Sequence, residues 1–568
     1  MIAMLFAAPG RCDPNYDPSP FGINGLKLMH MRGNPNMWES ARKPAKVMKD
    51  AGIYWDRLEL WWSDLEPEKD RFEWTFADNA AEFYREQGIH AMVILCYHSA
   101  WSKGTPPHDA DERARYANYV YRVVSRYKDT YKVWEIWNEP NIPTFWPNPN
   151  VEHYTLMLKE AYKAAKRADP DCTVLAASTS GPGNDFIRGI YENGGWDYCD
   201  GISIHPYSMC GGPIAQRLDR ILRLTNKFIG STGKPKSLWI TEMGWTTHAP
   251  GLDERQAIYL FQSYVISLAN GVEKFFWFDL ADWAEKWGIV RKIDPLDAKP
   301  AYETYTLMTR HLGSPGRCAE FEGYLRMPEG VACYVFKKTS GERVLVLWSS
   351  SDQPRQVKLP QSDGLSGVDI FGSRVDVCGG RLLVGATPVI VTGLDCGRRL
   401  QTATQFNPYL EKKGQNLLNN GSLDIIHGDA PGWWTAGRFD RSAKDGEFAV
   451  TDEGRGGSKC VSISKSGDRA AWDACLIPVE PGKRHRLTAW LRTEDATGNN
   501  QIGLFWYGGS MWPYRGEARS ETITGTHGWT NVSVVGTAPK DAVFVRANLI
   551  SENNSGATWF DDVVLVEE

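Results

Sequence analysis

Eight short apolar runs, rich in β-branched and aromatic residues, recur along the first 310 residues at a spacing of roughly 30–40 residues. Amphipathic stretches such as 152–168 and 254–269 separate these runs, so strands and helices alternate. This alternation predicts an α/β fold with a parallel sheet, and eight regular units favour a closed (β/α)8 TIM barrel. The predicted strands are 21–25, 53–59, 90–97, 132–138, 173–178, 201–205, 237–241 and 274–279.

A doubly wound open sheet is the alternative fold for this pattern. Such sheets rarely contain eight regular units, and no GxGxxG turn follows the first predicted strand. The barrel therefore explains the pattern better.

Two short motifs place a glutamate at the end of a predicted strand. Trp137-Asn138-Glu139-Pro140-Asn141 ends the fourth strand, and Trp239-Ile240-Thr241-Glu242-Met243-Gly244-Trp245 ends the seventh. The active sites of these barrels lie at the C-terminal ends of the strands, so both carboxyl groups are expected at the same rim. A pair of carboxyl groups on either side of a sugar bond is what glycoside hydrolysis requires. One glutamate before a proline can equally be a turn residue, so the inference depends on the pair.

Composition narrows the choice of function. The chain has 568 residues, enough for two to four domains, and its net charge of −5 gives no reason to expect nucleic acid or an anionic membrane as a partner. No apolar run of about 18 residues exists, which argues against a membrane span. The 24 tryptophans suit stacking on sugar rings, and they suit large cores equally well.

The eleven cysteines are scattered, and neither a CxxC motif nor a Cys/His spacing for a structural zinc occurs. Cys318 with Cys333 and Cys460 with Cys475 are candidate local disulfides, and buried thiols are the alternative. The opening residues Met1 to Gly10 have a short apolar core without a basic lead. This segment favours a secreted or periplasmic location over a cytoplasmic one.

The barrel region resembles the clan A glycoside hydrolases, retaining enzymes with an acid/base after the fourth strand and a nucleophile after the seventh. Several shorter motifs carry the same resemblance, and among the families of the clan they look most like family 39. The matching motifs are Gly52-Ile-Tyr-Trp-Asp-Arg57 with Glu66-Pro67, Phe72-Glu73-Trp74 with Asp78, Gly201-Ile-Ser-Ile-His205-Pro206-Tyr207, and Lys299-Pro300-Ala301-Tyr302.

The resemblance implies a role for each glutamate. Glu139 would be the general acid/base and must carry a proton when the reaction begins. Glu242 would be the nucleophile and must be ionised, with Arg57 as the cation that keeps its pKa low. Asn138 would bind the 2-hydroxyl of the sugar. Glu135 lies deeper on the same strand face as Glu139, and we interpret it as structural.

Further substrate-binding residues follow from strand ends and from the same resemblance. His205 and Tyr207 would hold the nucleophile by hydrogen bonds, His98 would bind a sugar hydroxyl, and Trp277 would be the stacking floor of the central subsite. Four aromatic residues in rim loops are candidates for neighbouring subsites: Trp101, Phe145, Trp146 and Trp245.

The sequence divides into a barrel over residues 1–312, a β-sandwich over 313–396, a polar linker over 397–415 and a C-terminal unit over 416–568. The last unit resembles jelly-roll carbohydrate-binding modules. Asp424 and Asp561 are candidate ligands for a structural calcium ion in that module. A sugar-stacking platform is predicted from four clustered aromatic residues: Trp506, Tyr507, Trp512 and Tyr514.

The sequence thus predicts a retaining β-glycosidase that hydrolyses O-glycosidic bonds of plant or microbial oligo- or polysaccharides by double displacement. No cofactor is expected for catalysis, because two carboxylates suffice. An endo-β-glycanase or a β-galactosidase of another clan A family is the enzymatic alternative. A non-catalytic carbohydrate-binding protein is the alternative from a different functional class.

Overall fold

The computed structural model describes residues 18–99, 101–102, 106–207, 211–249, 251–314, 317–350, 353–361, 363–394, 400–437, 446–468, 470–509 and 512–568. The chain forms two compact units. The first extends to Pro408, except for Gly181–Asp185 and Ser208–Leu224, which group with Tyr409–Glu568 in the second unit.

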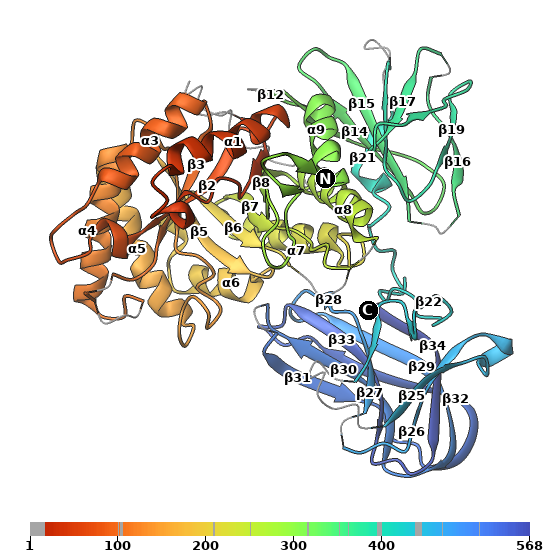
Figure 1. Ribbon diagram of the computed structural model, residues 1–568. Coiled ribbons are helices and arrows are strands. Elements are labelled where there is room, and N and C mark those ends of the chain that lie inside the picture. The colour runs from red at the N-terminus through yellow and green to blue at the C-terminus, as the bar shows by residue number, and fades with distance from the viewer. Residues whose placement is uncertain are drawn as a thin grey trace. The chain divides into compact units, whose positions relative to one another are not determined.

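Eight parallel strands close into a barrel in the order of the sequence, which confirms the predicted (β/α)8 fold (Figure 1). The strands are β1 (Phe21–Ile23), β2 (Trp55–Trp61), β3 (His90–Cys96), β4 (Val133–Ile136), β5 (Thr173–Ser180), β6 (Gly201–His205), β7 (Ser237–Met243) and β8 (Val272–Trp277). Closure comes from β1, which pairs with both β2 and β8.

Helices follow the strands and lie outside the barrel (Figure 1). Two of them begin at side-chain caps: Asp109 accepts the Glu112 N–H at the start of α4, and Asn150 accepts the His153 N–H at the start of α5. The helices are α1 (Met37–Asp50), α2 (Trp62–Leu65), α3 (Thr75–Gln87), α4 (Ala110–Tyr127), α5 (Val151–Ala168), α6 (Asn184–Glu192), α7 (Leu218–Ser231), α8 (Leu252–Ala269) and α9 (Pro300–Leu312). Short 3-10 turns span Leu28–Met31, Trp196–Tyr198, Thr404–Phe406 and Arg455–Gly457.

The barrel interior changes from apolar to polar along the strands. A buried cluster contains Trp55, Met92, Val133, Leu175 and Trp239 from the first half of their strands, and Ile94, Cys96 and Phe276 from further along β3 and β8. Glu135, His205 and Thr241 are also fully buried, and they lie further along their strands. Polar side chains therefore gather toward the C-terminal ends, where the two glutamates were predicted.

A β-sandwich follows the barrel in the first unit. Its larger sheet has the order β18-β17-β20-β15-β14-β13-β21, and β16 pairs with β19. The strands are β13 (Glu320–Leu325), β14 (Val331–Lys337), β15 (Arg343–Ser349), β16 (Arg355–Lys358), β17 (Ser366–Asp369), β18 (Arg374–Val375), β19 (Arg381–Val384), β20 (Val389–Thr392) and β21 (Thr402–Ala403). The segment predicted as a linker thus contributes β21, because its backbone pairs with the edge strand β13.

Two antiparallel sheets form the second unit, with the orders β24-β27-β33-β30-β31 and β25-β26-β34-β29-β32. The first contains β24 (Trp434–Ala436), β27 (Ala471–Ala474), β30 (Asn499–Tyr507), β31 (Tyr514–Arg519) and β33 (Phe544–Glu552), and β28 (Ile477–Pro478) pairs with β33. The second contains β25 (Glu447–Thr451), β26 (Cys460–Ser464), β29 (Arg484–Ala496), β32 (Gly525–Thr537) and β34 (Ala557–Glu567). Three pairs of short strands complete the described fold: β9 (Val290–Lys292) with β10 (Asp297–Ala298), β11 (Gly313–Ser314) with β12 (Arg317–Cys318), and β22 (Ile426–His427) with β23 (Ala430–Pro431).

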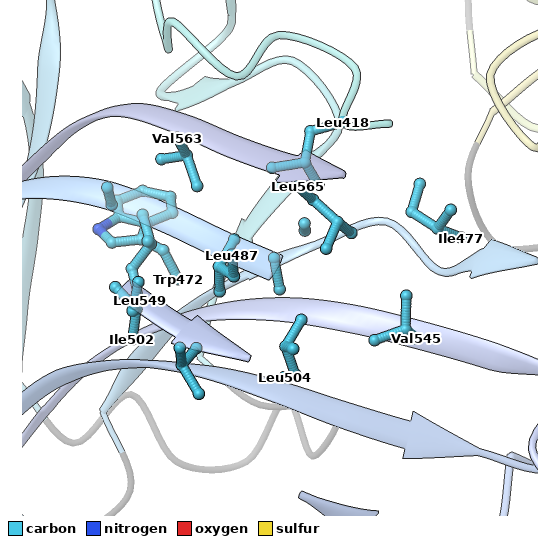
Figure 2. Close-up of a cluster of buried hydrophobic side chains, with 14 of the residues drawn as sticks. Leu418, Trp472, Ile477, Leu487, Ile502, Leu504, Val545, Leu549, Val563 and Leu565 are labelled. Atoms are coloured by element: carbon cyan, nitrogen blue, oxygen red, sulfur yellow. The ribbon is translucent and has the colours of Figure 1, made fainter. Parts of the chain in front are cut away.

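The core of the second unit lies between these two sheets. Figure 2 shows Leu504 and Leu549 from one sheet beside Leu487 and Leu565 from the other. The unit also packs its first residues on its last strand, because the Leu417 N–H donates to Leu565 O (2.7 Å) and the Val563 N–H donates to Gly421 O (2.7 Å). A Cβ at Gly421 would lie 2.2 Å from Val563 O, so only glycine permits this approach.

The eight cysteines within the described ranges are free thiols, and they include both members of each candidate disulfide. Burial explains why five of them have pKa values above the usual range: Cys96, Cys172, Cys199, Cys333 and Cys460. Within the same ranges, none of the helices combines the length and the apolar character needed to cross a membrane.

Adjacent residues of β34 provide a test of the sandwich register. Leu565 is fully buried and Val564 is 36% exposed, so Leu565→Ala should lower the free energy of unfolding by about 2–5 kcal/mol. Val564→Ala, the matched control, should cost about 0.5 kcal/mol or less. Urea unfolding followed by circular dichroism measures both values. Equal losses in the two variants would show that the register of β34 is wrong.

Candidate active site

The guanidinium of Arg57 on β2 connects the polar groups of the barrel interior. Its Nη1 donates to Glu242 Oε2 (3.0 Å), and its Nη2 donates to Glu135 Oε2 (2.7 Å) and to Asn138 Oδ1 (2.8 Å). The Arg57 side chain is only 3% exposed, and that of Glu135 is fully buried. One cation therefore holds three of the predicted groups in a fixed geometry.

Glu139 and Glu242 lie close together at the C-terminal ends of β4 and β7. One carboxylate oxygen from each and one ring nitrogen of His205 all lie within 4.8 Å of one another. The side chains of Glu139 and Glu242 are 10% and 17% exposed, so both line a confined site. Carboxyl groups of retaining glycosidases are about 5–5.5 Å apart, whereas inverting enzymes need about 6.5–9.5 Å to admit a water molecule.

The backbone that presents Glu139 is unusual. Trp137 and Glu139 have φ of 70° and 43°, and the neighbouring Ala177 and Ser178 at the end of β5 have φ of 81° and 44°. Residues with a Cβ rarely adopt this left-handed region, and each such residue costs energy. The two segments support each other, because the Glu139 N–H donates to Ser178 O (2.9 Å). The strain is concentrated where the chain positions Glu139.

Tyr207 and His205, both predicted to hold Glu242, contact different glutamates. The Tyr207 hydroxyl donates to Glu242 Oε1 (3.0 Å), as expected. His205 instead places Nδ1 2.9 Å from Glu139 Oε1, and its Nε2 lies 3.0 Å from the Thr241 hydroxyl. The prediction for His205 was therefore wrong in its partner, because the ring uses Nδ1 for Glu139 beyond β4 and Nε2 for Thr241 on β7, which leaves neither nitrogen for Glu242.

Two residues of the network were not found by sequence reasoning. Thr241 donates from Oγ1 to Glu135 Oε1 (2.8 Å), and Ser178 Oγ lies 3.3 Å from His205 Nε2. Both are fully buried. The available signal was their position, because Thr241 directly precedes Glu242 and Ser178 lies near the end of a predicted strand.

Glu135 carries a charge inside the barrel core and contacts residues of the candidate site. Burial raises the pKa of its carboxyl, but the positive charge of Arg57 and the neighbouring hydrogen-bond donors outweigh burial and leave the pKa below its usual range. Glu135 is therefore ionised at neutral pH. The structural interpretation holds, and the residue also contacts the site directly through Arg57 and Thr241.

The pKa of Glu242 differs from the expectation of a low value. Burial raises the pKa of Glu242, and the neighbouring Glu139 raises it further, while Arg57 and the Tyr207 hydroxyl oppose this shift. Arg57 and Tyr207 both donate to Glu242, and these hydrogen bonds favour its ionised form.

The remaining predicted barrel residues do not join this network. His98 lies two residues beyond β3 with an exposed side chain. Trp277 at the end of β8 is fully buried and packs on Trp245 with ring centroids 5.8 Å apart, so it does not offer an open stacking face. The position of Trp277 at the end of a strand was correct, but its ring belongs to the core.

The four rim aromatics also differ from one another. Trp146 is fully buried. Trp101 packs edge-on against Trp62 and donates its indole N–H to Glu66 O (2.7 Å). Phe145 stacks on Tyr97, with centroids 5.7 Å apart and planes 9° apart. Trp245 contacts Tyr259 as well as Trp277. Packing among aromatic residues thus explains most of these side chains.

The candidate calcium ligands in the second unit are held by hydrogen-bond donors. Asp561 Oδ2 accepts the Arg455 N–H (2.8 Å) and the Ser458 hydroxyl (3.0 Å), and Asp424 Oδ1 accepts the Lys459 N–H (3.1 Å). Calcium requires a shell of oxygen ligands, whereas donors are aimed at these two carboxylates. Donors of the segment from Arg455 to Lys459 therefore bind one oxygen of each carboxylate, and a calcium ion at these residues stays a prediction.

The predicted sugar platform in the second unit is wrong for Trp506. This ring is 3% exposed and belongs to the core between the sheets. Successive residues of a strand face opposite sides, so Trp506 and Tyr507 on β30 cannot share one surface. Tyr514 is 55% exposed, and its ring lies 6.4 Å from that of Tyr507.

Comparisons with known proteins agree with the barrel geometry. The model of glycosyl hydrolase family 10 matches residues 29–177. A stretch of 90 residues is 29% identical to a β-xylosidase of Geobacillus stearothermophilus, and this match covers 15% of the chain and only 17% of that enzyme. The structure of a family 39 glycoside hydrolase from Bacteroides cellulosilyticus WH2 superimposes with a TM-score of 0.54 at 24% identity, over 63% of this chain and 79% of that one. In its barrel, the chain is similar to clan A glycoside hydrolases.

Removal of the Arg57 guanidinium tests its place in the network. Arg57→Met leaves Glu135 buried without its cation, so the free energy of unfolding should fall by about 3–5 kcal/mol in urea unfolding. Arg126→Met is the matched control, because Arg126 pairs with Asp78 on the surface, and it should cost at most about 1 kcal/mol. The double variant Arg57→Met/Glu135→Gln should regain part of the loss. A loss in Arg57→Met no larger than in the control would contradict this account.

Proposed function

We propose that the barrel hydrolyses β-glycosidic bonds of oligo- or polysaccharides with retention of the anomeric configuration. The observation that carries this proposal is the approach of Glu139 and Glu242 to within 4.8 Å at the C-terminal rim. That distance is shorter than the separation of about 6.5–9.5 Å that an inverting enzyme needs to place a water molecule between its carboxyl groups, which supports retention. The contacts of each glutamate then suggest its role.

In the first step, a Glu242 oxygen attacks the anomeric carbon while the bond from that carbon to the leaving-group oxygen breaks. Glu139 transfers its proton to the departing oxygen, and a covalent glycosyl-enzyme forms. In the second step, Glu139 takes a proton from water, the resulting hydroxyl group bonds to the anomeric carbon, and Glu242 leaves as a carboxylate. Two inversions at the same carbon give net retention.

The neighbours of the two glutamates support this division of labour. Arg57 and Tyr207 donate to Glu242 and orient its carboxylate, which favours the nucleophile. His205 lies against Glu139, whose proton the first step consumes. Asn138 presents its amide beside the same site, with Oδ1 fixed by Arg57, so its NH2 group is oriented for a sugar hydroxyl.

The two carboxylates do not determine which sugar the enzyme prefers. A relative with local similarity is named a β-xylosidase, so aryl β-xylosides are the first substrates to test, followed by aryl β-glucosides, β-galactosides and soluble polysaccharides. An endo-acting enzyme would prefer the polymers. A non-catalytic binding protein would release no aryl group from any of them.

Chemical rescue by azide distinguishes the two glutamates. Glu242→Ala should reduce turnover by ~10⁴-fold or more, and added azide should restore activity on an activated aryl β-glycoside and yield the α-glycosyl azide. Glu139→Ala should still cleave activated aryl substrates and yield the β-glycosyl azide. Product anomers are read by NMR. Glu152→Ala, at an exposed position of α5, serves as the control. The same anomer from both active-site variants would refute the assigned roles.

The pH dependence of kcat/KM reports the ionisation of Glu242. Because Glu242 acts as a carboxylate, its ionisation sets the rising acid limb of the profile. The Tyr207 hydroxyl favours the charged form, so Tyr207→Phe should raise the pKa of Glu242 and move this limb to higher pH by about one unit. Tyr162→Phe removes a hydroxyl that contacts Asp200 outside the site and should leave the limb unchanged. A shift toward lower pH would exclude Glu242 as the group that must ionise.

A further inference from the structure

Four buried side chains form a continuous line of hydrogen bonds across the barrel interior. Thr241 Oγ1 lies 2.8 Å from Glu135 Oε1, His205 Nε2 lies 3.0 Å from the same Thr241 oxygen, and His205 Nδ1 lies 2.9 Å from Glu139 Oε1. Glu135, Thr241 and His205 are fully buried. The line begins at a residue with no direct contact to a reacting atom and ends at the proposed acid/base.

Glu135 determines which way the Thr241 hydroxyl donates its hydrogen bond. Glu135 is ionised, since Arg57 holds its pKa below the usual range despite burial, and a carboxylate only accepts hydrogen bonds. Thr241 has a single hydroxyl hydrogen, and the charged oxygen at 2.8 Å competes for it better than a neutral ring nitrogen at 3.0 Å. Thr241 therefore donates to Glu135, and its oxygen is left to accept from His205.

The Thr241 hydroxyl in turn determines which ring nitrogen of His205 carries a hydrogen. Because the Thr241 oxygen accepts, His205 Nε2 carries a hydrogen, and in the neutral ring Nδ1 is then an acceptor. Arg57 Nη2 lies 3.5 Å from His205 Nε2. The two hydrogens of Arg57 Nη2 are already directed to Glu135 and Asn138, so they do not require Nε2 as an acceptor.

We propose that Glu135 and Thr241 are positioning residues that set the tautomer of His205 and thereby keep the proton on Glu139. An unprotonated Nδ1 presents a lone pair to Glu139 Oε1, which disfavours a negative charge on this carboxyl and so favours its protonated form. When Glu139 gives its proton to the leaving group, its carboxylate faces the Nδ1 lone pair, which favours recovery of a proton from water in the second step. No atom of Glu135 or Thr241 touches the substrate in this scheme, which rests on the proposed function.

Other ionisable groups around these four residues also affect the protonation of Glu139. Glu242 lies within 4.8 Å of both Glu139 and His205, Tyr207 donates to Glu242, and Arg57 donates to Glu135 and Glu242. Ser178 Oγ lies 3.3 Å from His205 Nε2 and can accept as a second partner. None of these contacts involves the Thr241 hydroxyl. A substitution that removes only this hydroxyl therefore tests the proposal most directly.

Thr241→Val removes the hydroxyl at nearly constant volume, and Thr241→Ser retains it. Without the hydroxyl, His205 is free to place its hydrogen on Nδ1 and to donate to an ionised Glu139. The basic limb of kcat/KM against pH should therefore move to lower pH by about one unit in Thr241→Val and stay in place in Thr241→Ser. Thr304→Val is the matched control, because Thr304 is equally buried but donates to Ile370 O away from the site.

NMR of ¹⁵N-labelled histidine provides a readout that does not depend on activity. The His205 ring, assigned by its loss in His205→Asn, should carry its hydrogen on Nε2 in the unmodified protein and in Thr241→Ser, and on Nδ1 in Thr241→Val. A hydrogen on Nδ1 or on both nitrogens in the unmodified protein would overturn the proposal. So would an unshifted basic limb in Thr241→Val, or an equal shift in Thr304→Val. If the protein hydrolyses none of the substrates but His205 shows the expected tautomer, the proposed function is refuted. The order of hydrogen bonds from Glu135 to His205 is then still supported.

Discussion

The ion pair between Arg57 and Glu135 is the contact on which the rest of the candidate site depends. A guanidinium inside a barrel core is costly to desolvate, and it is retained only where carboxylates and amide oxygens surround it. Glu135 supplies a permanent buried charge below the site, and Glu242 and Asn138 then take the remaining donors. Glu135 thus neutralises the charge of Arg57 from within the barrel, and the other guanidinium donors orient Glu242 and Asn138 at the site.

This arrangement explains how two chemically identical side chains can take the different tasks proposed for them. Glu242 receives hydrogen bonds from a cation and a phenol, whereas Glu139 faces an imidazole and is held by a backbone in the left-handed region. Both are confined, so their mutual repulsion is not screened by water. The difference arises from which strand ends lie next to each glutamate, because β4 and β7 contribute the same residue in a similar position.

The barrel and the place of the glutamates could be predicted because both follow from periodicity and strand order. Active sites of such barrels lie at the C-terminal ends of the strands, and this rule placed Glu139 and Glu242 at one rim, whereas Arg57 reaches Glu242 from the third residue of β2. The partners across the barrel could not be read this way. Whether His205 meets Glu139 or Glu242 depends on the stagger of neighbouring strands, which no single strand encodes. The contribution of Thr241 was hidden for the same reason.

Aromatic residues were the weakest part of the prediction. Trp146, Trp277 and Trp506 were assigned to sugar contacts, and all three are buried. A tryptophan serves equally well in a core and on a binding face, so its presence in a motif does not reveal its exposure. For Trp506, strand alternation would have been decisive, since its neighbour Tyr507 must face the opposite side of β30. The low pKa expected for Glu242 failed because burial and a second carboxyl group outweigh one cation.

The hydrogen bonds between the opening residues of the second unit and β34 have a consequence for how this unit can be attached to other proteins. Leu417 and Gly421 bond directly to the strand that completes the fold, so the chain enters and leaves the unit at neighbouring points. A unit with adjoining ends can be inserted into a surface loop of a host domain without forcing the two sides of that loop apart. The same closure links the two ends energetically, because deleting the last strand also removes the partners of the first residues.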